Sequence, residues 1–280
     1  MTGVLKLGLI GDNIAQSRSP DLHETCGRLA GIETRYERLV PRALGLSFEQ
    51  VFAKAKADGL RGVNVTYPYK ERAFALLDTC DGDIQAIGAV NTVLFDEGTT
   101  HGFNTDCSGF IHAYRAARSA KPDTVCLIGA GGVGKAVAFA LLALNARAII
   151  CVDLDTARAQ ALADALSATG TQAKITVSDD AVASAQGANG IINCTPMGMS
   201  GIGGSPLPDY AMQQAVWAFD AVYTPSNTAF LGAARGAGLR AISGFDLFRH
   251  MAIRSFTAYT GIVPDPETVL PRLETFAPDT

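Results

Sequence analysis

The residues best placed to do chemistry begin with a glycine-rich segment whose spacing is G-x-G-x-x-G, Gly129-Ala130-Gly131-Gly132-Val133-Gly134. An apolar run, Thr124–Ile128, precedes it and an alanine-rich stretch follows, so a strand, a turn and a helix are expected in the order that the motif requires. The first glycine allows a tight turn, the second lets backbone amides approach a pyrophosphate, and the third permits close packing of the helix on the strand. A bare glycine turn is the less favoured alternative.

An acidic residue follows at the distance expected for a group that contacts a ribose. Asp153 ends the next apolar run, about 20 residues after Gly134. Its carboxylate would repel a 2′-phosphate, so NAD is predicted and NADP is disfavoured. Asp153 could instead cap the following helix, a role open equally to Asp155. Arg158, one turn into that helix, could stack on an adenine or tolerate a phosphate, which leaves some use of NADP open.

Polar residues gather at three places in the first part of the chain, where strands are expected to end. The three clusters are residues 17–23, residues 64–70, and residues 102–106 together with 89–92. A nicotinamide enzyme that interconverts an alcohol and a ketone needs a proton shuttle, and Lys70 with Asp106 could supply it. Lys70 could instead be a solvated cation at a helix start, and Asp106 could cap a helix that begins near Gly109.

The elements that must position these residues alternate along the whole chain. In the second half, strands are expected at 124–128, 148–152, 174–177, 190–194, 217–222 and 240–243, and helices at 133–144, 156–168, 180–185 and 228–237. Such alternation predicts a Rossmann-type doubly wound parallel sheet. The first hundred residues predict a second α/β unit, with strands near 5–10, 34–39, 62–65 and 91–95 and helices near 22–30 and 48–57. A last helix at 245–259 is expected to return to this N-terminal α/β domain.

Composition excludes several other classes of protein. The chain has 280 residues, is 48% hydrophobic and carries a net charge of −4, so a globular protein is expected and neither disorder nor nucleic-acid binding is. No signal peptide and no membrane span are predicted, which points to the cytoplasm. Six cysteines stand alone without metal-ligand spacing, so neither a disulfide nor a metal is expected, and Cys126 and Cys151 are interpreted as small buried hydrophobes.

Taken together, the polar clusters resemble the shikimate and quinate dehydrogenases over nearly the whole chain. The shared motifs are S-x-S-P-x-x-H at 17–23, N-V-T-x-P-x-K at 64–70, G-A-V-N-T at 88–92, G-x-N-T-D-x-x-G at 102–109, the glycine turn, and D-A-V-Y at 220–223. The family includes enzymes of aromatic amino acid biosynthesis and their quinate-oxidising relatives.

This resemblance implies a role for most of the polar residues. Lys70 and Asp106 would form the catalytic pair. The hydroxyls of Ser17 and Ser19 would hold a substrate carboxylate, although either serine could also cap the helix near Pro20. Three further residues would contact the ring hydroxyls or the carboxylate: Asn91, Thr66 and Tyr223. Gly244 would lie near the nicotinamide. The expected cofactor-binding set also includes Leu154, Cys194, Thr195, Pro196 and Val222.

The chain departs from the common family pattern in three places. Asp153-Leu154-Asp155 replaces the basic Asn-Arg-Thr loop of the biosynthetic members, as in NAD-using quinate/shikimate members, and Glu24 replaces an asparagine. Met251 stands where a substrate-contacting glutamine is usual. Because a methionine cannot donate to a ring hydroxyl, shikimate is expected to be a weaker substrate, and an aminoshikimate becomes plausible.

The sequence therefore predicts a substrate domain formed by residues 1–106 and 247–280 and an NAD-binding Rossmann domain formed by residues 107–246. The predicted reaction is hydride transfer between NAD and a small polyhydroxylated cyclic carboxylate, shikimate or a close analogue. Quinate or aminoshikimate dehydrogenation is the nearer alternative, and a non-catalytic NAD-binding sensor is the distant one. A monomer or a homodimer is expected.

Overall fold

The computed structural model describes residues 3–277, which fold into two compact α/β units. The first unit comprises residues 3–105 and 249–276, and the second comprises residues 106–248 together with residue 277. The predicted domain limits also include residues 1–2 and 278–280, which lie outside the described residues. Two long helices carry the chain from one unit to the other: α6 (Thr105–Ala117) and α11 (Gly244–Thr260).

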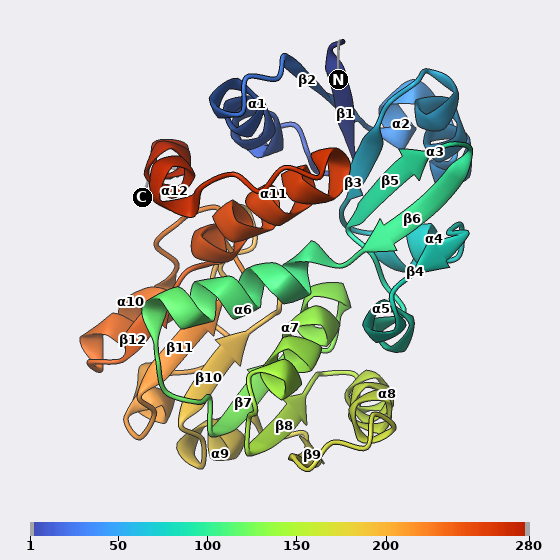
Figure 1. The fold of residues 1–280 in the computed structure, drawn as a ribbon. Helices are drawn as coiled ribbons and strands as arrows, with labels where there is room; N and C mark the ends of the chain where they lie inside the picture. The colour runs from blue at the N-terminus through green and yellow to red at the C-terminus, as the bar shows by residue number, and fades with distance from the viewer. Residues whose placement is uncertain (1–2, 278–280) are drawn as a thin grey trace. The chain divides into compact units, whose positions relative to one another are not determined.

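A six-stranded mixed sheet forms the first unit, in the order β2-β1-β3-β5-β6-β4 (Figure 1). Its strands are β1 (Leu5–Ile10), β2 (Thr34–Leu39), β3 (Gly62–Val65), β4 (Thr79–Cys80), β5 (Thr92–Asp96) and β6 (Thr99–Phe103). β1, β2 and β3 are parallel, whereas β5 is antiparallel to both β3 and β6. The register places Asn64 opposite Thr92, so two of the polar clusters meet in the middle of the sheet.

The helices of the first unit are α1 (Ser19–Leu29), α2 (Pro41–Leu44), α3 (Phe48–Ala57), α4 (Lys70–Phe74), α5 (Gly82–Ile87), α12 (Pro266–Glu274) and the C-terminal part of α11. Phe48, Val51 and Phe52 of α3 pack on Val63 of β3 and Val93 of β5 in one hydrophobic core. A hydrogen bond from Asn64 to Ser255 of α11 confirms that the last long helix returns to this unit.

The second unit holds a six-stranded sheet, all parallel, in the order β12-β11-β10-β7-β8-β9. Its strands are β7 (Thr124–Ile128), β8 (Ala148–Val152), β9 (Lys174–Ser178), β10 (Gly190–Asn193), β11 (Trp217–Asp220) and β12 (Arg240–Ile242). Counted from β7, this is the doubly wound order 6-5-4-1-2-3, so the predicted Rossmann-type sheet is confirmed. The strand order reverses between β7 and β10, which is where such sheets bind ligands.

Helices cover both faces of this sheet. They are α6, α7 (Gly132–Ala143), α8 (Thr156–Ser167), α9 (Ala181–Gln186), the 3-10 helix η1 (Asp209–Met212), α10 (Ala229–Gly236) and the start of α11. On one face α9, η1 and α10 pack on Cys126 and Ala218. On the other face Phe110 of α6 packs edge-on against Phe219, with ring centroids 4.8 Å apart, because neighbouring strand residues point to opposite faces.

The sequence located most of the longer elements and missed the nine-residue α12 as well as several shorter ones. The predicted strands β7 and β8 and the helix α8 agree with the structure to within one residue. It missed β6, whose run Thr99–Phe103 contains His and Gly, and it missed the four-residue α2 and five-residue α4. Cys126 and Cys151 are fully buried, which confirms their interpretation as small hydrophobes, and burial raises the pKa of both thiols to about 12.

The described parts of residues 3–277 show neither a membrane-spanning helix nor a cluster of metal ligands. No helix there is long and apolar enough to cross a bilayer. Among the described side chains of these residues, which do not include that of Asp83, no three histidine, cysteine, aspartate or glutamate groups gather as metal ligands would.

Candidate active site

The glycine turn joins β7 to α7 in the second unit. Gly129 has φ +102°, a conformation that L side chains rarely adopt, and its N–H donates to the carbonyl of Val152 over 2.8 Å. A Cβ atom at position 129 would lie 2.7 Å from the carbonyl carbon of Cys194, and one at Gly134 would overlap the carbonyl oxygen of Gly129. The turn therefore closes against both neighbouring strands only because these positions carry no side chain.

The start of α7 is suited to an anionic group. Its N-cap is Gly131, which has no side chain to accept a hydrogen bond from the first turn, and that turn contains no acidic residue. The first N–H groups of a helix have no partner inside the helix and carry partial positive charge, so they attract phosphate. The nearest atom to a Cβ placed on Gly131 would be Nη2 of Arg158, at 3.4 Å. The guanidinium thus lies over the turn, and the residues fit a pyrophosphate.

Asp153 holds the glycine turn, and Asp155 caps the next helix. Oδ2 of Asp153 accepts a hydrogen bond from the N–H of Ala130 at 2.7 Å, and Oδ1 accepts one from the N–H of Asp155 at 2.9 Å. Asp155 is the N-cap of α8, because its Oδ1 accepts from Ala157 N at 3.0 Å. The alternative that Asp153 caps α8 is therefore wrong. Leu154, between them, is fully exposed.

The loop after β10 lies beside the glycine turn, because β10 is the neighbour of β7 at the place where the strand order reverses. The N–H of Cys194 donates to Ile128 O over 2.7 Å, which continues the β7–β10 ladder. Thr195, just before Pro196, donates through Oγ1 to Oδ1 of Asn193 at 2.7 Å, and Nδ2 of Asn193 donates to the buried carboxyl of Asp220 at 2.9 Å. Burial raises the pKa of Asp220 to about 6. This network fixes the loop to β10 and β11.

Gly244 lies against the end of β11. A Cβ there would be 2.5 Å from Ala221 O and 2.8 Å from Val222 O, so only glycine allows α11 to begin so close to this backbone. Three expected site residues are thus neighbours in the second unit: Val222, Tyr223 and Gly244. The ring of Tyr223 stacks on Phe248 of α11 with centroids 4.7 Å apart.

Ser17, Ser19 and Thr66 follow two neighbouring parallel strands of the first unit. The N–H of Thr66 donates to Ile10 O at 2.9 Å, so the loops after β1 and β3 are joined. Oγ of Ser17 accepts from Ser19 N at 3.2 Å and lies 3.1 Å from Ser19 Oγ, and both serines are buried. Ser19 is the first residue of α1, whose N-cap is Arg18, so the alternative that Ser19 caps the helix is wrong.

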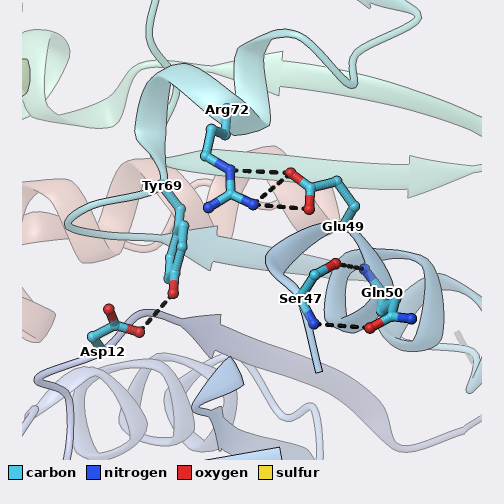
Figure 2. A network of polar contacts seen from close by, with 6 residues as sticks. All are labelled: Asp12, Ser47, Glu49, Gln50, Tyr69 and Arg72. Atoms are coloured by element: carbon cyan, nitrogen blue, oxygen red, sulfur yellow. Dashed lines mark hydrogen bonds and ion pairs between the residues drawn. The ribbon is translucent and has the colours of Figure 1, made fainter. Parts of the chain in front are cut away.

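Lys70 is the first residue of α4, and several contacts hold the start of this short helix (Figure 2). The preceding residue, Tyr69, donates its hydroxyl to Asp12 at 2.7 Å and stacks on Phe48. Arg72 of α4 forms a bidentate ion pair with Glu49 of α3, at 2.7 and 2.8 Å from Nη2 to the two carboxylate oxygens. Lys70 is half-buried rather than freely solvated.

The carbonyl of Lys70 leads to the next cluster, because it accepts a hydrogen bond from Val90 N at 3.1 Å. The next residue, Asn91, is buried, and its Oδ1 accepts from the N–H and from Oγ1 of Thr105, at 2.7 and 3.0 Å. Thr105 precedes Asp106, which is 4% exposed and lies in the first turn of α6. Because α6 begins at Thr105 and not near Gly109, the alternative that Asp106 caps it is wrong.

Met251 is buried on α11, in the part of the helix that belongs to the first unit. The first unit therefore contains six of the expected site residues: Ser17, Ser19, Thr66, Lys70, Asn91 and Met251. Sequence reasoning did not single out Asn64, Thr105 and Ser255, three buried polar residues hydrogen-bonded beside Asn91. Asn64 and Thr105 stand inside recognised motifs, and Ser255 belongs to the segment from which position 251 was counted, but none of the three was given a role.

Together, these features define a class of protein: an oxidoreductase with a dinucleotide-binding unit and a second α/β unit that gathers a lysine, serines, a threonine and an asparagine. Residues 9–93 match the family described as the shikimate dehydrogenase substrate binding domain. The chain is 40% identical to the quinate/shikimate dehydrogenase (NAD(+)) of Corynebacterium efficiens, over 93% of this chain and 94% of that protein. It is 35% identical to the shikimate dehydrogenase (NADP(+)) of Pseudarthrobacter chlorophenolicus, over 93% and 91%.

A solved structure with a similar fold is quinate dehydrogenase from Corynebacterium glutamicum in complex with NAD. It has a TM-score of 0.89 and 37% identity, over 98% of this chain and 99% of that one. Shikimate 5-dehydrogenase from Thermus thermophilus, in complex with NADP(H) and shikimate, has a TM-score of 0.84 and 32% identity, over 97% and 99%. The chain belongs to the shikimate/quinate dehydrogenase family.

Proposed function

We propose that this protein is an NAD-dependent dehydrogenase that interconverts a ring secondary alcohol, in shikimate or quinate, and the corresponding 3-dehydro ketone. The observation that carries the proposal is a short path of hydrogen bonds within the first unit. Lys70 O accepts from Val90 N, and in the next residue Asn91 Oδ1 accepts from Thr105 N. Lys70 and Thr105, the residue before Asp106, are thus both hydrogen-bonded to the segment Val90–Asn91. This supports the action of Lys70 and Asp106 as a pair.

In the proposed mechanism, Lys70 and Asp106 move the proton of the reacting hydroxyl. As the hydroxyl is oxidised, its proton passes to this pair while the hydrogen on the same carbon leaves as hydride. When bound, NAD supplies the hydride acceptor. Ser17 and Ser19 hold the ring carboxylate through neutral hydroxyls, and Thr66, Asn91 and Tyr223 orient the ring. We assign the proton transfer to the lysine and the aspartate together.

The proposed cofactor is NAD, held by the glycine turn, with the ribose beside Asp153. The carboxylate that holds Ala130 N also carries the negative charge that disfavours a 2′-phosphate. The remaining proposed cofactor contacts are Leu154, Arg158, Cys194, Thr195, Pro196, Val222 and Gly244. In this scheme residues 107–246 bind NAD, and residues 1–106 with 247–280 bind the ring.

The identity of the ring is proposed from one substitution. Met251 cannot offer the hydrogen bonds of a glutamine, so we propose that shikimate is bound more weakly than in relatives with that glutamine. Quinate and an aminoshikimate are the two competing substrates. We further propose that the protein works in the cytoplasm as a monomer or homodimer, which cell fractionation and light scattering test.

A substrate panel tests the proposal. Purified protein with NAD and shikimate, quinate or aminoshikimate should generate the absorbance of reduced cofactor, and the three kcat/KM values rank the substrates. Repeating the panel with NADP measures cofactor choice. If NAD binds with ordinary affinity but no ring alcohol turns over, the protein is the non-catalytic sensor, and the proposed function is wrong.

A further inference from the structure

Ser255, on α11, completes a cluster of buried hydroxyl groups in the first unit. Its Oγ lies 2.9 Å from Oγ1 of Thr92 and 2.9 Å from Oγ1 of Thr105, and the two threonine oxygens are also 2.9 Å apart. Asn64 donates to the same serine oxygen through Nδ2 at 3.1 Å. All four side chains are less than 5% exposed. The cluster joins α11 to β3, β5 and the start of α6.

The number of donor protons in the cluster determines which group donates each hydrogen bond. The amide nitrogen of Asn64 can only donate, so Ser255 accepts from it and must direct its own proton to one of the threonines. If Ser255 donates to Thr105, then Thr105 is free to donate to Oδ1 of Asn91, which lies 3.0 Å away. That oxygen also accepts from Thr105 N at 2.7 Å, and Oγ1 of Thr92 donates to it at 3.2 Å, so either threonine can pass the direction of the Ser255 proton on to Asn91.

This arrangement orients the side-chain amide of Asn91. With Oδ1 turned into the cluster, Nδ2 must face the other way. This nitrogen is buried and has no hydrogen-bond partner among the described side chains and backbone. A buried amide donor without a partner costs free energy, so such a group marks a place where a ligand acceptor is expected. A ring hydroxyl supplies that acceptor.

Ser255 also bears on Met251, because residues four apart lie on one face of a helix. The hydrogen bonds of Ser255 therefore hold the face of α11 that carries the residue proposed to select the ring. Asn91 and Met251 belong to the same unit.

We propose that Ser255 is a positioning residue for ring binding: through Thr92 and Thr105 it keeps the amide of Asn91 turned so that Nδ2 meets a ring hydroxyl. The proposal rests on the proposed function, since the ring is its ligand. Ser255 itself does not touch substrate. Its loss should therefore weaken binding of the ring more than it slows the chemical step.

The test compares Ser255→Ala with a matched control on the same helix, Thr257→Val. The hydroxyl of Thr257 donates to Ile253 O within α11 and joins no other element in the described hydrogen bonds. In Ser255→Ala, KM for the preferred ring acid should rise about 3- to 10-fold, the effect of one hydrogen bond, with kcat within about twofold. Thr257→Val should leave both constants unchanged, and Ser255→Thr, which restores a hydroxyl, should recover the KM.

A second measurement does not depend on turnover. The side-chain amide resonances of Asn91, assigned by their loss in Asn91→Asp, should shift in Ser255→Ala and stay in place in Thr257→Val. Unmoved Asn91 resonances, or a fall in kcat and melting temperature without a rise in KM, would overturn the role of Ser255. If the wild-type protein oxidises no ring acid, the proposed function fails, and the resonances alone decide whether Ser255 orients Asn91.

Discussion

Asp153 accepts a hydrogen bond from the backbone N–H of Ala130, with 2.7 Å between oxygen and nitrogen. One carboxylate therefore both fixes the glycine turn and places a negative charge at the end of β8. Because the helix cap is Asp155, the charge at 153 is not needed to begin α8. Asp153 can therefore affect the choice between NAD and NADP, whereas Asp155 stabilises the start of α8.

Replacing Asp153 with serine should shift cofactor preference. The variant loses the charge that repels a 2′-phosphate, so the ratio of kcat/KM for NAD to that for NADP should fall about 10- to 100-fold. Steady-state kinetics with both cofactors measure this ratio. Asp155→Asn is the control, because it removes a charge two residues away while keeping a good N-cap. An equal shift in both variants would show that general charge, not the position of Asp153, sets the preference.

Replacing Lys70 with alanine should abolish most turnover. Loss of a group that transfers a proton lowers kcat about 100- to 10,000-fold. Binding of NAD, followed by calorimetry, should stay within about twofold, since Lys70 belongs to the first unit and the glycine turn to the second. Lys54→Ala, which removes an exposed lysine paired with Asp58, is the control. A similar loss of NAD binding in Lys70→Ala would contradict the role in proton transfer.

A polar side chain introduced at position 251 should change the preference among ring substrates. Met251→Gln should raise kcat/KM for shikimate about 2- to 10-fold, because a donor becomes available to a ring hydroxyl. Met251→Leu, an apolar exchange of similar volume, should produce no such gain. Rates for the three ring acids in each variant are the measurement. If glutamine and leucine act alike, residue 251 does not contact the ring.

A histidine buried beside the sheet should make stability depend on acid pH. His23 is fully buried against Tyr36, and burial lowers its pKa from 6.5 to about 3. The unfolded chain binds this proton more readily, so the stabilisation is complete above pH 6.5 and is lost as pH falls toward 3. Between those values wild type should lose up to about 1.4 kcal/mol per pH unit more than His23→Phe.

Denaturant unfolding at several pH values gives these slopes. His101→Gln serves as the control, because His101 is only partly buried and its replacement should leave the acid dependence in place. Equal slopes for wild type and His23→Phe would show that His23 is not responsible.

Two glycines should respond to alanine in opposite directions. At Gly244 a Cβ meets carbonyl oxygens at 2.5 and 2.8 Å, so Gly244→Ala should lower the melting temperature and weaken NAD binding. At Gly232, inside α10, a Cβ meets nothing within 4 Å, and Gly232→Ala should stabilise the protein by up to about 1 kcal/mol. Scanning calorimetry of both variants tests the pair. A stable Gly244→Ala with normal NAD binding would contradict the close approach of α11 to β11.

The residue pattern was sufficient to predict those elements whose conformation depends on residues close together in the sequence. The run Thr124–Ile128 followed by G-x-G-x-x-G predicted β7, the turn and α7, because strand periodicity and glycine spacing act over a few residues. Short elements were missed for the same reason. Neither the five residues of α4 nor the two of β4 carry a periodic signal, and hydrogen bonds to distant segments hold them in place.

The sequence by itself determined the family, the doubly wound sheet, the glycine turn and the residues expected at the site, because each depends on residue types at fixed spacing. Only the tertiary structure decided that Asp153 holds Ala130 while Asp155 caps α8, and that Ser255 joins Asn64, Thr92 and Thr105. The physical reason is that a buried polar group must find partners, and those partners come from strands and helices far apart in the chain.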